Sequence, residues 1–180
     1  MTWRPPTGRL VPALAWGAAA LLLWGRFLVQ PSYVATRNLD ESWAQAMAHF
    51  YQTGAQAGED YVFPYGPLGY FVTGAYDPAL FWQRYAWEVV VKLAAVVLVL
   101  RALAAVPSWP VRLLGAAVLF VFAPFHQDGV YQVAILACGV LMAGAARQGR
   151  GWLVVETAFL AALALTKFNA FLTAAYVVLV

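Results

Sequence analysis

The sequence predicts an all-α, multi-pass transmembrane protein with five or six helical spans, and three observations carry this prediction. Of its 180 residues, 63% are hydrophobic and only 11% are charged, and the mean hydropathy is +0.70. Apolar runs close to membrane length alternate with short polar turns, and Lys and Arg gather at every second turn. A composition of this kind is typical of integral membrane proteins.

The first predicted span is the apolar run 10–29, which is close to the roughly 20 residues that a helix needs to cross a bilayer. Arg4 and Arg9 precede it. A signal peptide would have a shorter apolar region followed by small residues at a cleavage site, and neither feature occurs here. We therefore expect an uncleaved first span.

A large polar loop, 30–84, is expected between the first two spans, and its residues 38–53 form an interfacial amphipathic helix. Asn38 and Glu41 have the spacing of a capping box, and Gly54 follows as a helix-ending residue. The apolar face recurs at three- and four-residue steps and consists of Trp43, Met47, Phe50 and Tyr51.

The second span is predicted over 85–106 and ends at Pro107, because proline cannot continue the backbone hydrogen-bond ladder. The runs 111–125 and 130–146 are expected to form a helical hairpin around the tip 126–129. From Trp152 onward the chain is apolar again, with Thr166 and Lys167 as an interruption. One helix and two helices both fit this last stretch, which is why the number of spans is five or six.

Basic residues at the turns predict the orientation of the spans. With the amino terminus inside, six arginines fall on the cytoplasmic side: Arg4, Arg9, Arg101, Arg112, Arg147 and Arg150. The loop 30–84, the tip 126–129 and Lys167 then share the outer side. Basic residues occur singly at the ends of apolar runs, which excludes a nucleic-acid-binding surface.

The whole chain is expected to form one transmembrane domain, 1–180. Its last apolar run is still open at Val180, so we expect it to be the amino-terminal part of a longer multi-span protein. Cys138 is the only cysteine, so no intrachain disulfide forms.

Asp40 and Glu41 are the first candidates for chemistry. Acidic residues in a first helical turn complement the helix dipole and cap free amides, and this alone explains many such pairs. The alternative is that a carboxylate directly after the first span acts as a general base or binds a divalent cation. Asp40 is the candidate ligand for such a cation.

The second half of the loop combines acidic residues, aromatic residues and glycines. Glu59 and Asp60 precede Tyr65 and Gly66, which begin a Tyr-Gly-Pro-Leu-Gly stretch. Such stretches are ordinarily turns with interfacial anchors. Their density here favours a shaped ledge that contacts a substrate.

His126 and Asp128 lie at the predicted hairpin tip, where Asp is an ordinary turn residue. They are too few to form a metal site by themselves. What favours a functional role for Asp128 is its expected position on the same outer side as Asp40.

Lys167 is the strongest candidate for an anion site, because an ionisable side chain at membrane depth is costly and marks function by default. Glu88 and Lys92 are four residues apart and are expected to pair along one helix. Lys167 has no such partner nearby in the sequence. Its ammonium would suit a phosphate near the outer headgroups.

In layout and in these motifs the chain resembles the start of GT-C superfamily membrane glycosyltransferases, which include protein O-mannosyltransferases and bacterial lipid-sugar transferases. Asp40-Glu41 matches the acidic motif after the first span of that superfamily, and Asp128 matches a second acidic position in a later outer loop. The superfamily has many more spans than this chain and often a soluble carboxy-terminal domain.

The resemblance implies transfer of a sugar from a polyprenyl-phosphate donor to an acceptor at the outer face of the bacterial inner membrane. Asp40 would be the base or metal ligand, Asp128 an assisting carboxylate and Lys167 the contact for the lipid phosphate, with membrane lipids as further partners. The alternative is a non-enzymatic transporter, a lipid-handling subunit or a structural membrane subunit. Charges spread through the membrane depth would favour transport.

Overall fold

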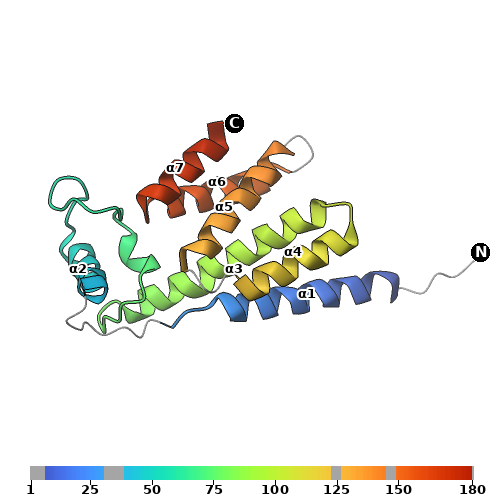
Figure 1. Ribbon diagram of the computed structural model, residues 1–180, viewed down its shortest axis with the longest axis horizontal. Coiled ribbons are helices and arrows are strands. Elements are labelled where there is room, and N and C mark those ends of the chain that lie inside the picture. The colour runs from blue at the N-terminus through green and yellow to red at the C-terminus, as the bar shows by residue number, and fades with distance from the viewer. Residues whose placement is uncertain (1–6, 31–38, 123–126, 145–148, 180) are drawn as a thin grey trace, which may run out of the picture.

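The computed structural model describes residues 7–30, 39–122, 127–144 and 149–179, and the side chains within these ranges except those at 7–13, 40, 41, 122 and 127. This part of the chain is all-helical (Figure 1). Its elements are α1 (Thr7–Phe27), α2 (Leu39–Thr53), the 3-10 turn η1 (Gly69–Val72), α3 (Phe81–Ala105), α4 (Trp109–Phe122), α5 (Gln127–Ala143), α6 (Arg150–Ala164) and α7 (Phe168–Leu179).

Helix α3 is the central element, and it contacts α1, α4, α5, α6 and η1. In Figure 1, α1, α3 and α4 run side by side along the long axis; α5 and α6 pack on one side of α3, and α7 packs on α5 and α6. Small side chains at Ala95, Ala134 and Cys138 are fully buried where α3 and α5 meet. Such residues let two helix backbones approach closely, so the main core forms here.

A second, smaller core joins α2 to η1 at the end of the molecule where α3 begins. Met47 and Ala48 of α2 pack in it with Tyr70 and Phe71 of η1. The predicted helix over 38–53 agrees with α2, and Gly54 follows it with a φ of 69°, a conformation that suits glycine. The amphipathic face of α2 is thus covered by protein.

Proline and threonine residues lie at the ends of α3, α4 and α6. Helix α3 stops before Pro107, and α4 has Pro110 in its first turn, where its missing N–H costs nothing. The apolar stretch from Trp152 forms two helices, α6 and α7, joined by a turn at Leu165, Thr166 and Lys167. This settles the number of helices that the sequence left open.

The prediction of five or six membrane spans is wrong for the described part of the chain, where no helix is both long and apolar enough to cross a membrane. Helices α4 to α7 have 12 to 17 residues, fewer than the roughly 20 that a span needs. Helix α3 has 25 residues but carries Arg84, Glu88, Lys92 and Arg101. In α1 the described side chains begin at Leu14 and cover less than a span.

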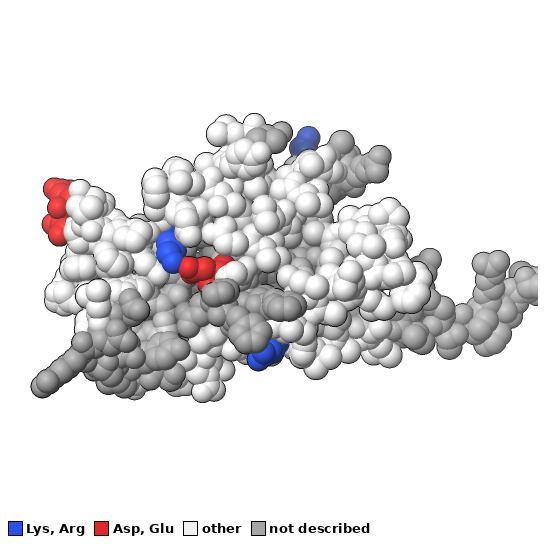
Figure 2. All heavy atoms as spheres, viewed as in Figure 1, with Lys and Arg blue, Asp and Glu red and all other residues white. Residues whose placement is uncertain are grey.

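Apolar side chains nevertheless cover much of the described surface. Figure 2 shows a face on which charged atoms occur only in a few small groups amid uncharged surface. Large apolar side chains are more than half exposed on α1, α4 and α7, among them Leu21, Leu114 and Leu172. Exposed apolar area of this extent marks a surface that contacts another apolar phase or partner.

Candidate functional site

The turn between α6 and α7 presents Lys167. The carbonyl of Leu163 accepts hydrogen bonds from both the backbone N–H (3.0 Å) and the hydroxyl (2.7 Å) of Thr166. Because the buried threonine closes this turn on itself, α6 ends and the chain changes direction before α7 begins at Phe168. Lys167 follows Thr166 in this turn and directly precedes α7.

Residues 64–68, hereafter the 64–68 segment, lie directly on this turn and pair with it through three backbone hydrogen bonds. The N–H of Gly66 donates to Thr166, that of Leu68 donates to Leu165, and that of Phe168 donates back to Pro64, at 3.0, 3.0 and 2.8 Å. Tyr65 and Lys167 face each other in an antiparallel bridge. A short two-stranded contact therefore joins chain segments about 100 residues apart.

Gly66 makes this contact possible. A Cβ atom at this position would lie 2.4 Å from the carbonyl oxygen of Leu165 and 3.0 Å from its carbonyl carbon. Both atoms belong to the backbone and cannot rotate away as a side chain does. Glycine is required here because the two backbones approach so closely.

Lys167 forms an ion pair with Asp128, and its Nζ also lies over the ring of Tyr65, 4.7 Å from the ring centroid. The Asp128 side chain is 41% exposed and that of Lys167 is 20% exposed, so the pair is open to solvent on the carboxylate side. Burial alone would lower the pKa of Lys167, but hydrogen bonds to Asp128 and Tyr65 outweigh it and raise the pKa above its usual value. The lysine therefore stays charged at neutral pH.

Asp128 reaches Lys167 from the first turn of α5, not from a loop tip. A carboxylate at this position complements the amino-terminal end of the helix dipole. Helix α5 thus holds the carboxylate while the turn before α7 holds the ammonium, and α5 and α7 are in contact. As expected, Lys167 has no partner nearby in the sequence. In the fold it pairs with Asp128, which lies 39 residues away along the chain.

An aromatic group, hereafter the aromatic ledge, adjoins the ion pair and consists of Trp43, Phe63 and Tyr65. The ring centroids of Trp43 and Tyr65 are 4.7 Å apart, and those of Trp43 and Phe63 are 5.2 Å apart. Beside the ledge lies a hollow of about 250 Å³, whose walls include Phe63, Tyr65, Phe168 and Phe171. A hollow with aromatic walls beside a partly exposed ion pair suits a ligand with both an apolar and a charged part.

No family model matches the chain, and neither curated proteins nor solved structures give a match.

Four of the predicted site residues come together in the structure: Tyr65, Gly66, Asp128 and Lys167. Glu59 and Asp60 lie instead in an exposed turn, where the Asp60 carboxylate accepts the N–H of Gln56 at 2.7 Å. No described contact connects these two acids to the ion pair.

The other predicted acids are described in part. Asp40 and Glu41 lie in the first turn of α2, but their side chains are outside the described residues, as are Asn38 and His126. Trp43, one turn further along α2, contacts Tyr65. The backbone of Asp40 is therefore within about one helical turn of the aromatic ledge, and its role as base or metal ligand stays a prediction.

The described residues do not fit a divalent cation. Among them, no three His, Cys, Asp or Glu side chains gather closely enough to hold a metal ion. Asp128 is paired with an ammonium, which occupies the place that a cation would take.

A buried charge network on α3 was only partly expected. Glu88 pairs with Lys92 at 3.0 Å, as predicted, but it also pairs with Arg84, which the sequence analysis placed in the loop. All three are at most 2% exposed. Arg84, Glu88 and Lys92 are spaced four residues apart, which places them on one helix face, and this spacing could have predicted that Arg84 joins the pair.

This network connects three parts of the fold. Arg84 donates twice to the carbonyl of Thr73 beside η1, at 3.0 and 2.8 Å. Glu88 accepts the N–H of Val29, and Lys92 donates to the carbonyl of Phe27 at the end of α1. Its charged groups are paired with one another and with backbone carbonyls and are closed to solvent, so the network connects α1 and η1 to α3.

Proposed function

We propose that the chain takes part in transfer of a sugar from a polyprenyl-phosphate donor to an acceptor at the outer face of the bacterial inner membrane. The observation that carries the proposal is the partly exposed Lys167–Asp128 pair beside the aromatic ledge. It combines a cation of the kind that suits phosphate with a carboxylate, the two charges that this transfer needs.

Lys167 is the proposed contact for the donor phosphate. Its ammonium has three donors, and Asp128 can release it because the carboxylate is 41% exposed and solvent reaches the pair. A phosphate that takes over the ammonium frees the Asp128 carboxylate. Binding of the donor thereby prepares the base.

The freed carboxylate of Asp128 is then placed to accept a proton. As the acceptor hydroxyl oxygen bonds to the anomeric carbon of the sugar, its proton passes to the carboxylate. The bond between the anomeric carbon and the phosphate oxygen breaks, and its electron pair stays on the phosphate, whose charge the Lys167 ammonium stabilises. Asp40 is the second candidate for the proton-accepting role.

The hydrocarbon part of the donor has a matching surface. Helix α7 begins directly after Lys167, and its exposed large apolar side chains follow one face: Phe168, Phe171, Leu172, Tyr176, Val178 and Leu179. We call this set the α7 stripe. A lipid whose phosphate binds Lys167 can lay its chain along the α7 stripe, with gain in buried apolar area.

Two substitutions test the proposal by separating donor binding from transfer. Lys167→Met should weaken donor binding about tenfold or more, because it removes a charge-assisted contact to phosphate. Asp128→Asn should leave donor affinity unchanged or higher and lower the transfer rate by roughly a hundredfold or more. Binding is measured with a polyprenyl phosphate, and transfer with the polyprenyl-phosphate sugar.

Asp77→Asn is the matched control. Its carboxylate caps Ala79 and Leu80 at 2.9 and 3.2 Å and lies outside the proposed site, so transfer should change little. Equal and mild effects of Asp77→Asn and Asp128→Asn on transfer would contradict the assignment of Asp128. Unchanged donor affinity in Lys167→Met would contradict that of Lys167.

A lipid-handling function without transfer is the second candidate. The α7 stripe favours it, because an apolar surface that starts at a cation binds a lipid phosphate whether or not a reaction follows. In that case Lys167→Met would still weaken binding, and no transfer would be detected with any donor tested.

A further inference from the structure

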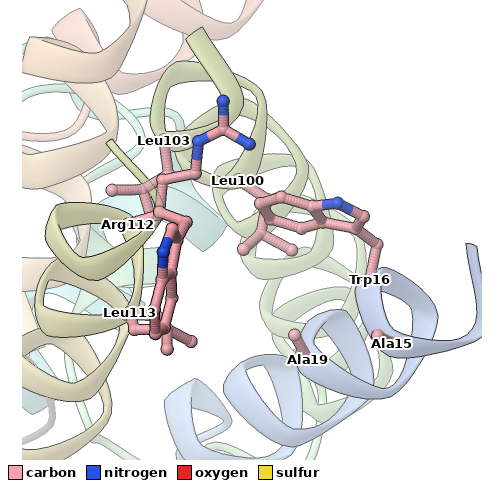
Figure 3. Close-up of a pocket in the computed structure, with 9 residues that line it drawn as sticks. Ala15, Trp16, Ala19, Leu100, Leu103, Arg112 and Leu113 are labelled. Atoms are coloured by element: carbon pink, nitrogen blue, oxygen red, sulfur yellow. The ribbon is translucent and has the colours of Figure 1, made fainter. Parts of the chain in front are cut away.

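A second apolar slot lies between α1, α3 and α4, away from Lys167 (Figure 3). Its volume is about 330 Å³, within the range of small-molecule sites in proteins. Its walls include Trp16, Ala19, Leu100, Leu103, Trp109 and Arg112. The slot lies near the carboxyl-terminal end of α3. Its lining residue Leu103 is roughly five helical turns from Arg84, which lies near the start of that helix.

Two tryptophans give the slot a surface suited to lipid. Trp109 is 69% exposed and Trp16 is 36% exposed, although large aromatic side chains are ordinarily well buried in a core. An indole ring combines a broad apolar face with one N–H donor and is enriched where hydrocarbon meets water. The slot thus has apolar walls and amphipathic edges.

Arg112 adds a positive charge at one edge. In Figure 3 its guanidinium lies at the rim, and the ring of Trp16 lines the facing side. Its Nε donates to the carbonyl of Val106 at 2.5 Å, which fixes the side chain at the end of α3. Within the described part of the chain, no carboxylate forms an ion pair with Arg112, and its remaining N–H donors are available to an anion.

We propose that this slot binds an anionic phospholipid, with the phosphate on Arg112 and part of an acyl chain between Trp16 and Trp109. Charge complementarity selects this occupant: a planar guanidinium recognises phosphate oxygens in pairs, while the apolar lining side chains suit hydrocarbon. The site is independent of the proposed transfer reaction, because none of its lining residues belongs to the Lys167 site.

The test compares two lipids with identical chains, dioleoyl phosphatidic acid and dioleoylglycerol, which differ only in the phosphate. Binding to the full chain in detergent is measured by native mass spectrometry. The phosphate-bearing lipid should bind about tenfold more tightly. Arg112→Gln should reduce this preference to less than about twofold, whereas Arg150→Gln, at an exposed position outside the slot, should preserve it.

A second variant tests the apolar part. Ala19→Trp fills the slot and should lower the binding of both lipids by a similar factor, with helix content and melting temperature checked by circular dichroism. Lys167→Met should keep the full lipid preference, which separates this slot from the proposed donor site.

Three results would overturn the proposal: an equal preference in wild type and Arg112→Gln, unchanged binding in a folded Ala19→Trp, or complete competition by inorganic phosphate at millimolar concentration. The last result would mean that the phosphate alone accounts for the affinity.

Discussion

Gly66 is the residue on which the contact between the 64–68 segment and the α6–α7 turn depends. The space above its Cα is filled by the backbone of Leu165, and the hydrogen bond to Thr166 holds the two chains at that distance. The position of Tyr65 over Lys167 follows from this contact. The geometry of the candidate site therefore depends on the absence of a Cβ atom at residue 66.

Substitution of Gly66 by alanine should separate the segment from the turn. We expect a loss of about 1–3 kcal/mol in the free energy of unfolding, typical of overpacking, and weaker binding of polyprenyl phosphate. The free energy is measured by chemical unfolding followed by circular dichroism. Gly25→Ala is the control, because a Cβ there has no atom within 4 Å; a loss as large in the control would refute the steric explanation.

The residue types of the site could be predicted from sequence, but their pairing could not. Tyr65, Gly66 and Lys167 stood out through aromatic density, glycine spacing and an ionisable group in an apolar run. The partner of Lys167 is 39 residues away, and nothing in local spacing indicates which of several distant acids it meets. Helix packing decides that choice.

At the scale of elements, the network on α3 ties α1 and η1 to the central helix. Arg84 and Lys92 flank Glu88 one turn to each side, and together they carry one net positive charge inside the protein. Burial lowers the pKa of Lys92, while Glu88 opposes this shift. Glu88 therefore keeps two buried cations compatible with each other.

Glu88→Gln should destabilise the protein by about 3–5 kcal/mol, because it leaves both cations without their shared carboxylate. Lys92 then has a still lower pKa in the folded state than in the unfolded state. The unfolded state binds more protons, so the stability of the variant should rise with pH. Chemical unfolding at pH 7 and pH 9 measures both effects.

Glu59→Gln is the control at an exposed acid, with an expected change within about 0.5 kcal/mol. If Glu88→Gln were equally mild, or equally destabilising at both pH values, this account of the network would be wrong.

Helix positions could be predicted better than helix lengths and surroundings. Gly54, Pro107 and the amphipathic pattern of α2 gave the right elements. The predicted spans are wrong for the described part of the chain because α4 to α7 are too short to cross a membrane and α3 carries four charged side chains. The run from Trp152 is divided at Thr166 by a hydrogen bond to Leu163 and by pairing with the 64–68 segment, a tertiary contact that no local pattern contains.

At the scale of the whole molecule, many large apolar side chains of the described residues are exposed, and on the face shown in Figure 2 the charged side chains occur in few places. The α7 stripe begins at the candidate site, so the apolar surface and the ion pair are continuous. A lipid has a charged head group and a hydrocarbon chain, and a surface of this kind can contact both parts of one lipid molecule.

Leu172→Glu should reduce binding of the full chain to phospholipid vesicles about tenfold or more, because it removes an apolar side chain from the α7 stripe and adds a charge. Gln83→Glu adds the same charge at an exposed position on α3 and should have little effect. Vesicle flotation measures both. Equal binding of the two variants would show that the α7 stripe does not contact lipid.

The bridge between Tyr65 and Lys167 also has a consequence for the order in which the chain assembles. The 64–68 segment leaves the ribosome about 100 residues before the turn that receives its hydrogen bonds, and contacts between such distant residues form slowly because a long loop must close first. A nascent chain that ends before residue 165 contains the aromatic ledge and Asp128 but not the ammonium between them. The candidate site consequently has all its residues only when the turn between α6 and α7 has been made.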